Sequence, residues 1–276
     1  MWDVTAGVLR WDGGGDGAGG WRPVEPPPPP QECPVAIVID GMSQAVLMAT
    51  PHDLRDFALG FALTEGLIAT PEDVQGFDEA ELSAGGFPAR EARLWLRPGL
   101  AARLAERRRS MIGPVGCGLC GVDSIAAALP PVVPVASDWV MPPQDVARAM
   151  AALSQGQARR RETPAIHGAA FWDGAGAVTR EDVGRHNALD KLAGALARTG
   201  RAAGQGAVVM SSRLSVDLVQ KVARIGAPVL IGASAPTALA LAWAERAGIT
   251  LIARARGDGF DLYTHPRRIA GSQGPQ

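Results

Sequence analysis

Three short apolar segments that alternate with two amphipathic segments restrict the fold of this chain more than any other feature of its sequence. The apolar segments are residues 207–210, 228–231 and 249–253, and helical patterns at about 215–225 and 234–247 separate them. Short apolar strands that are linked by crossover helices form parallel sheets, because both faces of such strands are buried. The sequence therefore predicts an α/β fold with a βαβαβ unit near its C-terminal end.

Further elements are expected on the N-terminal side of this unit. Residues 169–172 and 177–179, joined by Asp173-Gly174, predict a β-hairpin. A helix that begins near Pro142 should precede this hairpin, and a helix with Asp182 as its N-cap should follow it. These elements extend the C-terminal α/β region upstream.

The N-terminal half predicts a mixed α+β domain. Leu54, Phe57 and Phe61 are spaced to form one apolar helix face. The expected elements are a hairpin of residues 35–39 and 45–48 that turns at Asp40-Gly41, a helix from about residue 53 to a stop at Gly66, and a strand over residues 92–96.

Composition divides the chain into three parts. Residues 1–31 contain a glycine tract and five consecutive prolines, a composition that builds no core, and they are interpreted as a disordered leader. Prolines at 130, 131 and 134 suggest a boundary near residue 135. We therefore expect an N-terminal domain over 32–135 and a C-terminal domain over 136–276.

Charge and cysteine content limit the class of protein. The formal net charge of −1 favours neither nucleic acid nor a membrane as partner. Three cysteines are too few for a disulfide-stapled secreted domain, and no apolar segment is long enough to span a bilayer. The expected location is the cytoplasm.

Two of the three cysteines, Cys117 and Cys120, form a CxxC pair flanked by glycines. Such a pair is compatible with sulfur chemistry, a reversible disulfide or half of a metal site. A zinc site normally needs four ligands, so a zinc-bridged dimer would be required here. A thioredoxin-like role is disfavoured because that CxxC opens a helix within a βαβ unit. Arginines at 107–109 would lower the pKa of the thiols, which favours a persulfide carrier.

Polar residues gather where the predicted parallel strands end. In an open parallel sheet, ligands bind beyond the carboxyl ends of the strands, where free helix N–H groups favour anions. An alternative is that these serines only cap helices. The residues predicted to contact an anionic, nucleotide-like ligand are Ser212, Arg213, Ser234, Thr237, Arg254, Ala255, Arg256, Gly257, Asp258 and Gly259.

A second polar cluster runs from Glu181 to Lys191. His186 and Asp190 are four residues apart, so they share a helix face on which the carboxylate would orient the imidazole. Arg185 and His186 are therefore added to the predicted binding residues. A purely structural network that joins the two halves of the chain is the alternative explanation.

Taken together, four motifs make the chain from about residue 32 to 265 resemble the FdhD family of formate dehydrogenase accessory sulfurtransferases. The motifs are GCGLCG at 116–121, EDVGRHNALDK at 181–191, SSRLS at 211–215 and SAPT at 234–237. The resemblance implies a homodimer whose C-terminal domain has a cytidine-deaminase-like fold without zinc.

The resemblance also implies an activity and partners. A member of this family takes sulfur from a cysteine desulfurase and transfers it to the bis-molybdopterin guanine dinucleotide cofactor, which is then inserted into formate dehydrogenase. Cys117 matches the family's persulfide cysteine, Cys120 its companion, and residues 254–259 the segment that contacts the cofactor. A GDP-like nucleotide would mimic the bound cofactor. A non-catalytic chaperone that only delivers the cofactor is the rival hypothesis.

Overall fold

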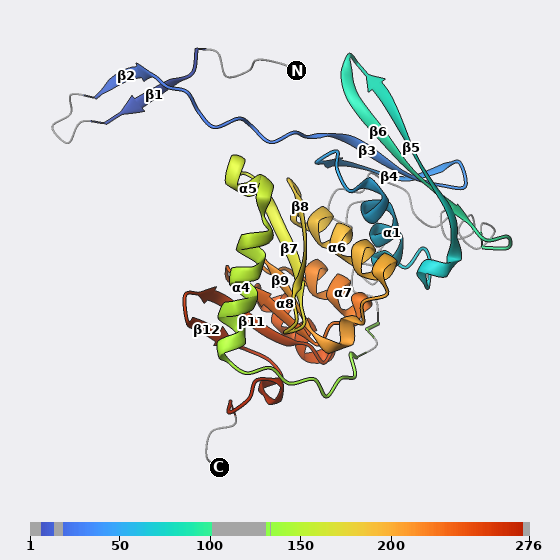
Figure 1. The fold of residues 1–276 in the computed structure, drawn as a ribbon, viewed down its shortest axis with the longest axis vertical. Helices are drawn as coiled ribbons and strands as arrows, with labels where there is room; N and C mark the ends of the chain where they lie inside the picture. The colour runs from blue at the N-terminus through green and yellow to red at the C-terminus, as the bar shows by residue number, and fades with distance from the viewer. Residues whose placement is uncertain (1–6, 14–18, 101–130, 133, 273–276) are drawn as a thin grey trace.

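The computed structural model describes residues 7–13, 19–100, 131–132 and 134–272. Within these residues the chain forms three sheets, and helices cover both faces of the largest of them (Figure 1). The strands are β1 (Leu9–Asp12), β2 (Gly20–Pro23), β3 (Cys33–Ile39), β4 (Met42–Ala49), β5 (Val74–Ala84), β6 (Phe87–Leu96), β7 (His167–Trp172), β8 (Ala177–Asp182), β9 (Ala207–Met210), β10 (Val229–Gly232), β11 (Thr250–Arg256) and β12 (Gly259–Leu262). The helices are α1 (Leu54–Thr64), α4 (Gln144–Gly156), α5 (Ala158–Glu162), α6 (Arg185–Thr199), α7 (Val216–Ile225) and α8 (Ala238–Arg246), with short 3₁₀ turns at Pro71–Asp73, Ala203–Gln205 and Pro266–Arg268.

The largest sheet has six strands in the order β12-β11-β10-β9-β7-β8. Strands β9, β10 and β11 run parallel, which confirms the predicted βαβαβ unit. The hairpin β7–β8 extends one side of this unit and β12 the other, both in antiparallel pairing. The result is a mixed sheet whose three central strands are parallel.

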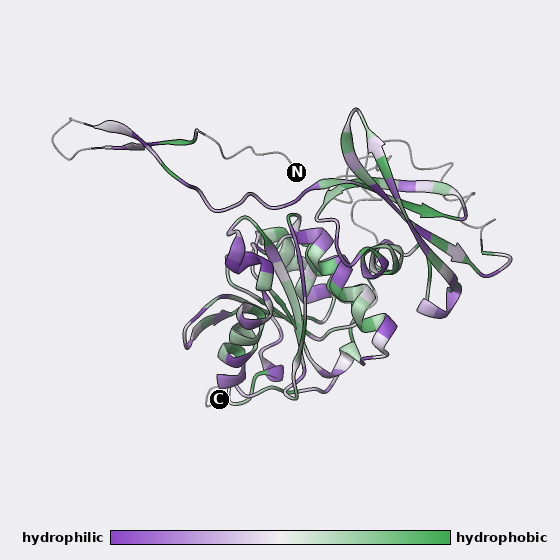
Figure 2. Cartoon of the chain, turned by 45° about the horizontal axis from the view of Figure 1, so that its top comes forward, coloured by the Kyte–Doolittle hydropathy of each residue, from purple (hydrophilic) through white to green (hydrophobic). Residues whose placement is uncertain are grey.

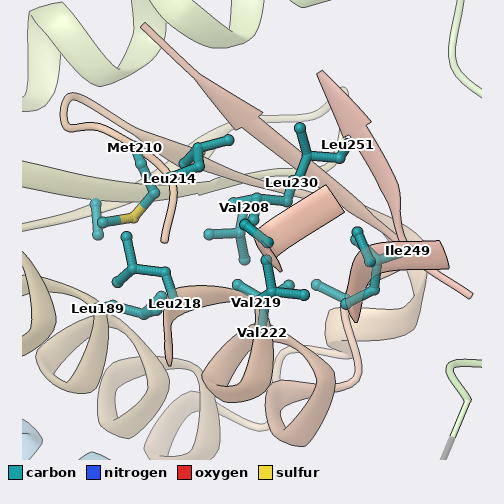
Figure 3. Close-up of a cluster of buried hydrophobic side chains, with 14 of the residues drawn as sticks. Leu189, Val208, Met210, Leu214, Leu218, Val219, Val222, Leu230, Ile249 and Leu251 are labelled. Carbon is teal, nitrogen blue, oxygen red and sulfur yellow. The ribbon is translucent and has the colours of Figure 1, made fainter. Parts of the chain in front are cut away.

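Helices cover both faces of this sheet. The core between the sheet and helices α6, α7 and α8 contains Leu189, Val208, Val219 and Leu230, each fully buried (Figure 3). Helix α4 covers the opposite face, where Val146 and Leu153 belong to a core shared with β7, β9 and β11. All residues of β9 and β10 are buried, which explains why the sequence of these two strands is continuously apolar.

A smaller sheet of four strands, in the order β4-β3-β6-β5, lies in the N-terminal part. The predicted hairpin β3–β4 and helix α1 are confirmed, and Gly66 ends the helix segment with a φ of 67°. Strand β5 was not predicted, because seven of its eleven residues are exposed and the others follow no regular alternation, so it has no apolar period. Helix α1 packs between this sheet and α6.

The segment that the sequence predicts to be disordered contains a hairpin instead. Strands β1 and β2 pair antiparallel, with Trp11 opposite Trp21 and their ring centroids 5.2 Å apart. This cross-strand aromatic pair is a local contact that composition does not show. The domain divisions at 31/32 and 135/136 stay predictions, as does the likeness to cytidine deaminases.

Candidate functional site

The ends of several strands meet at one edge of the six-stranded sheet. The parallel strands β9, β10 and β11 all end there, and β8 ends beside them because it is antiparallel to β7. For the same reason β7 begins at this edge, with His167 opposite Asp182. Helices α6, α7 and α8 follow β8, β9 and β10, so their N-termini lie at the same edge. Three helix N-termini at one place favour an anion.

Backbone hydrogen bonds join the loops at this edge. Ser211 N–H donates to the Gly168 carbonyl (3.0 Å), and Gly168 N–H donates to Ser211 Oγ (2.8 Å). Leu214 N–H donates to the Ala235 carbonyl (3.3 Å), and Arg254 N–H donates to the Ser234 carbonyl (3.3 Å). The edge is therefore one connected surface that is built from four strand ends.

Three buried side-chain atoms at this edge have no hydrogen-bond partner among the described residues. They are His167 Nδ1, Arg185 Nε and Ser215 Oγ. Buried polar atoms are almost always paired in native proteins, because an unpaired one costs about 1–3 kcal/mol. Burial, with Arg185 and Arg160 nearby, lowers the pKa of His167, so its imidazole is neutral at pH 7. These atoms are consistent with a polar, anionic ligand at this edge.

His186 lies against the carboxylate of Asp217, which is in the first turn of α7. The predicted pairing of His186 with Asp190 is therefore wrong, because Asp190 points into the buried interface with α1. Burial lowers the pKa of His186 to about 4, although Asp217 opposes this shift. His186 is consequently neutral at pH 7 and oriented by Asp217, a residue that the sequence did not single out.

The second half of the 181–191 segment forms a buried network. Lys191 Nζ lies 2.6 Å from Asp182 Oδ2 and donates to the Thr50 carbonyl (2.9 Å). Asn187 Nδ2 donates to Asp182 Oδ1 and to the Met48 carbonyl, both at 2.9 Å. Asp182 is thus the last residue of β8 and the ion-pair partner of Lys191. The prediction that it is the N-cap of α6 is wrong, because Gly184 occupies the N-cap position.

A similar network surrounds Lys221. Its ammonium group donates to Asp190 Oδ1 (2.8 Å), Glu65 Oε1 (2.7 Å) and Thr64 Oγ1 (2.9 Å). Burial raises the pKa of Asp190 to about 6 in spite of Lys221. Both lysines of the chain are therefore buried. Lys191 connects the loop before α1 to β8, and Lys221 of α7 connects the end of α1 to α6. The structural alternative holds for Asn187, Asp190 and Lys191, whereas Arg185 and His186 lie at the sheet edge.

The other predicted binding residues differ in their accessibility. Ser212 is buried and donates to the Arg213 carbonyl (3.1 Å), while the Arg213 side chain is exposed. Thr237 caps α8, since its Oγ1 accepts a hydrogen bond from Ala240 N–H (3.2 Å), as the capping alternative predicts. Ser234 is half-buried at the edge.

Residues 254–259 differ from their prediction. Strand β11 continues to Arg256, and Gly257, with a φ of 55°, and Asp258 turn the chain into β12. Arg254 is exposed and pairs with Asp261 of β12, and Ala255 is buried in the core between the sheet and α4. This segment is a hairpin turn that no helix follows, so it has no helix N-terminus that would attract an anion. Arg256 and Gly259 remain exposed at the edge.

Cys117 and Cys120 lie outside the described residues. Cys33 is buried in β3, and burial raises the pKa of its thiol, which makes it a poor nucleophile. Within the described part of the chain, no group of three or more histidine, cysteine or acidic residues is arranged to hold a metal ion. Nor does any helix there have the length and apolarity to cross a membrane.

A cavity of about 190 Å³ lies away from the sheet edge, among the C-terminal ends of α1, α6 and α7. It is lined by Leu63, Leu196, Arg201 and Arg224, among others. Because the N-termini of α6 and α7 mark the sheet edge, this cavity lies at the opposite ends of those helices.

Comparison with known proteins decides the family. The model of the FdhD/NarQ family matches residues 30–270. The chain belongs to the FdhD/NarQ family. A curated relative from Agrobacterium fabrum, named sulfur carrier protein FdhD, is 48% identical over 244 residues, which are 87% of this chain and 88% of the relative. A relative of the same name from Bordetella bronchiseptica is 46% identical over 87% of this chain and 86% of its own length.

A solved structure supports this assignment. The crystal structure of a putative formate dehydrogenase accessory protein from Desulfotalea psychrophila has a TM-score of 0.67 and 25% sequence identity to this chain, with 95% of this chain and 97% of that chain covered. Most of this chain therefore shares its fold with that protein. The resemblance that the sequence motifs indicated is confirmed at the level of the family.

Proposed function

We propose that this FdhD/NarQ protein is a sulfur carrier that serves a formate dehydrogenase. Cys117 takes sulfur from a cysteine desulfurase as a persulfide, and Cys120 assists its onward transfer. The acceptor is the bis-molybdopterin guanine dinucleotide cofactor, which binds as a substrate at the edge of the six-stranded sheet. The names of the curated relatives support the carrier role.

The observation that carries the proposal is the set of unpaired buried atoms at the sheet edge. His167 Nδ1, Arg185 Nε and Ser215 Oγ offer donors to an anionic ligand, next to three helix N-termini. A guanine dinucleotide carries phosphates, which helix N-termini and arginine bind well. Neutral His167 and His186 add hydrogen-bonding capacity without a fixed charge.

Each sulfur transfer exchanges one S–S bond for another. The Cys117 thiolate attacks the outer sulfur of the desulfurase persulfide, so that one S–S bond breaks, another forms and the desulfurase thiolate leaves. The Cys120 thiolate then attacks Cys117 Sγ, and the outer sulfur departs as sulfide to the metal of the cofactor. The two cysteines end as a disulfide, which a thiol reductant returns to two thiols.

A persulfide-mapping experiment tests the carrier role. The protein is incubated with a cysteine desulfurase and cysteine, and bound sulfur is located by intact mass and peptide mapping. We expect one added sulfur on wild type and on Cys120→Ala, and none on Cys117→Ala. Cys33→Ala is the matched control and should load normally, because Cys33 is buried. Sulfur on Cys120 alone would reverse the roles of the two cysteines, and loading without either would end the proposal.

A nucleotide-binding experiment tests the site separately. GDP stands in for the cofactor and its affinity is measured by calorimetry. Arg185→Ala should weaken binding at least tenfold, since it removes a charge-assisted donor. Arg246→Ala is the control, because Arg246 is exposed in the last turn of α8, away from the edge. Equal losses in both variants would contradict the placement of the ligand.

The rival chaperone function makes a different prediction. A protein that only delivers the cofactor would still support an active formate dehydrogenase when Cys117 is replaced by Ala. The carrier function requires that this variant, although it binds GDP normally, leaves formate dehydrogenase inactive.

A further inference from the structure

The hairpin β1–β2 and the segment that follows it stand apart from the rest of the molecule. We call the described residues 7–13 and 19–32 the arm. In both Figure 1 and Figure 2 the arm extends away from the sheets and helices. The family match begins at residue 30, so nearly all of the arm lies outside it.

The hairpin of the arm has one apolar face and one charged face. Leu9 pairs with Pro23 and Trp11 with Trp21, and paired residues share a face. Arg22 forms an ion pair with Asp12 on the opposite face. The apolar side chains are exposed, with Trp11 at 52% and Trp21 at 65%. An isolated two-stranded hairpin is only marginally stable in water, so this face needs a covering surface.

A matching surface lies on the outer face of the small sheet. It consists of Pro34, Ala36, Val46 and Met48, which we call the β3–β4 patch. Pro34 pairs with Met48 and Ala36 with Val46, on the face opposite the core that contains Val35 and Leu47. Val46 is 57% exposed and Met48 is 55% exposed.

The patch also lies beside an unprotected sheet edge. Within the described residues β4 pairs only with β3, and its sequence MSQAVLMA contains no charge and no proline. Natural proteins usually protect edge strands with charges, prolines or a covering element, because an open edge pairs with other chains. An uncharged edge next to exposed apolar residues indicates that something covers it.

The linker decides where the arm can dock. Residues 24–32 contain five consecutive prolines, Pro26 to Pro30, which favour a stiff polyproline II helix. Nine residues in this conformation span roughly 28 Å at about 3.1 Å per residue. The patch begins at Pro34, two residues after the end of this linker. A stiff linker therefore holds the hairpin β1–β2 away from the patch of its own chain.

We propose that the arm docks on the β3–β4 patch of a second copy of this chain. In a two-fold dimer each arm crosses to the partner's patch, so the contact forms twice. Each tryptophan presents roughly 150–250 Å². The two arms contribute four tryptophans, and about half of each side chain is exposed. Covering this exposed area and an equal area of the two patches buries on the order of 1,000 Å², which is enough for a specific interface. The charged face with Arg10 and Arg22 stays in solvent.

Photo-cross-linking in a mixed sample tests this arrangement. Val46 is replaced by p-benzoylphenylalanine in full-length protein, and ¹⁴N and ¹⁵N preparations are mixed, exchanged and irradiated. Proteolytic cleavage after Glu32 separates the arm from the patch. The mass of each cross-linked peptide pair then shows whether its two peptides carry the same isotope or different ones. We expect residue 46 to be linked to the peptide that contains Trp11 and Trp21, and half of the pairs to carry mixed labels.

Variants then test the apolar face of the arm. Trp11→Ser together with Trp21→Ser should abolish the mixed-label cross-link and raise the dimer dissociation constant at least tenfold in sedimentation velocity. Arg10→Ser together with Arg22→Ser, on the other face of the hairpin, is the matched control and should change that constant less than twofold. All four side chains are exposed, so neither pair should unfold the protein.

Several outcomes would overturn the proposal. Cross-links with a single label only would place the arm on its own chain. A cross-link from residue 46 to the segment 101–130 would give the patch another occupant. A monomeric protein, or a dimer that the tryptophan pair leaves unchanged, would show that the arm does not join two copies.

Discussion

The close contact between α1 and α6 determines whether Gly60→Ala stabilises or destabilises the protein. Gly60 of α1 lies against α6, and a Cβ atom added to it would be 1.7 Å from the Asp190 carbonyl oxygen. Gly194 of α6 has the reciprocal contact, with a Cβ position 1.9 Å from the Asp56 carbonyl oxygen. The obstructing atoms are backbone on both sides, so only separation of the helices would make room.

Gly60→Ala changes the free energy of unfolding through a local effect and a tertiary effect of opposite sign. Alanine is better than glycine in a helix interior by roughly 0.5–1 kcal/mol. Overpacking costs about 1–3 kcal/mol, and occasionally more. Here the helices would also pull apart the hydrogen bond from Thr64 Oγ1 to Asp190 Oδ1, which is 2.6 Å long. We therefore expect a net loss of about 3 kcal/mol, or roughly 6–12 °C in melting temperature.

Urea and thermal unfolding, followed by circular dichroism, measure this loss. Gly204→Ala is the matched control, because the nearest atom to its added Cβ is 3.9 Å away. Gly60→Ala combined with Gly194→Ala should cost less than the sum of the single changes, since both require the same separation of α1 from α6. A melting temperature of Gly60→Ala at or above that of wild type would refute the close packing of these helices.

The remaining predictions concern buried ionisable groups and one helix cap. Because the pKa of His186 is lowered to about 4 from an unfolded value of about 6.5, the unfolded state binds more protons between these values and stability rises with pH. His186→Gln should remove this pH dependence, which amounts to at most roughly 3 kcal/mol in the free energy of unfolding between pH 4 and 6.5. Urea unfolding over this pH range measures it, and an unchanged pH dependence would contradict a neutral buried His186. The pKa of Asp190 is raised to about 6, so its contribution to stability falls as pH rises from about 4 to about 6. Relative to wild type, Asp190→Asn should therefore gain stability across that window, and a relative loss would contradict the sign. Thr237→Ala removes the cap of α8 and should cost about 1 kcal/mol, whereas Thr237→Ser should cost little; equal costs would show that the hydroxyl does not cap.

The elements of the fold follow largely from local patterns. The continuous apolar segments of β9 and β10 and the spacing of Leu54, Phe57 and Phe61 in α1 each depend on a period of a few residues. The same is true of the turn at Asp40-Gly41, whose residues both have positive φ. Strand β5 carries no such period, and the alternation in the hairpin of the arm covers only four residues on each strand, so only pairing with a neighbouring strand reveals them.

The residues of the site were predicted less completely than the fold. Arg185, Ser212 and Ser234 lie at the predicted edge of the sheet, because the ends of parallel strands meet there in every such fold. His167 was missed, although it opens a strand antiparallel to β9 and thereby reaches the same edge. Asp217 was missed because its contact with His186 joins two helices that are separate in the sequence.

The sequence by itself determined the family, through four motifs, and the order of strands and helices, through local periodicity. Tertiary structure decided the role of each polar residue within those motifs. Asp182, Asp190 and Lys191 are as polar as Arg185 and His186, yet they are buried against α1 and Thr50 while the other two lie at the sheet edge. A local pattern fixes which face of a helix a residue occupies, whereas the partner of that face comes from a segment more than 100 residues away.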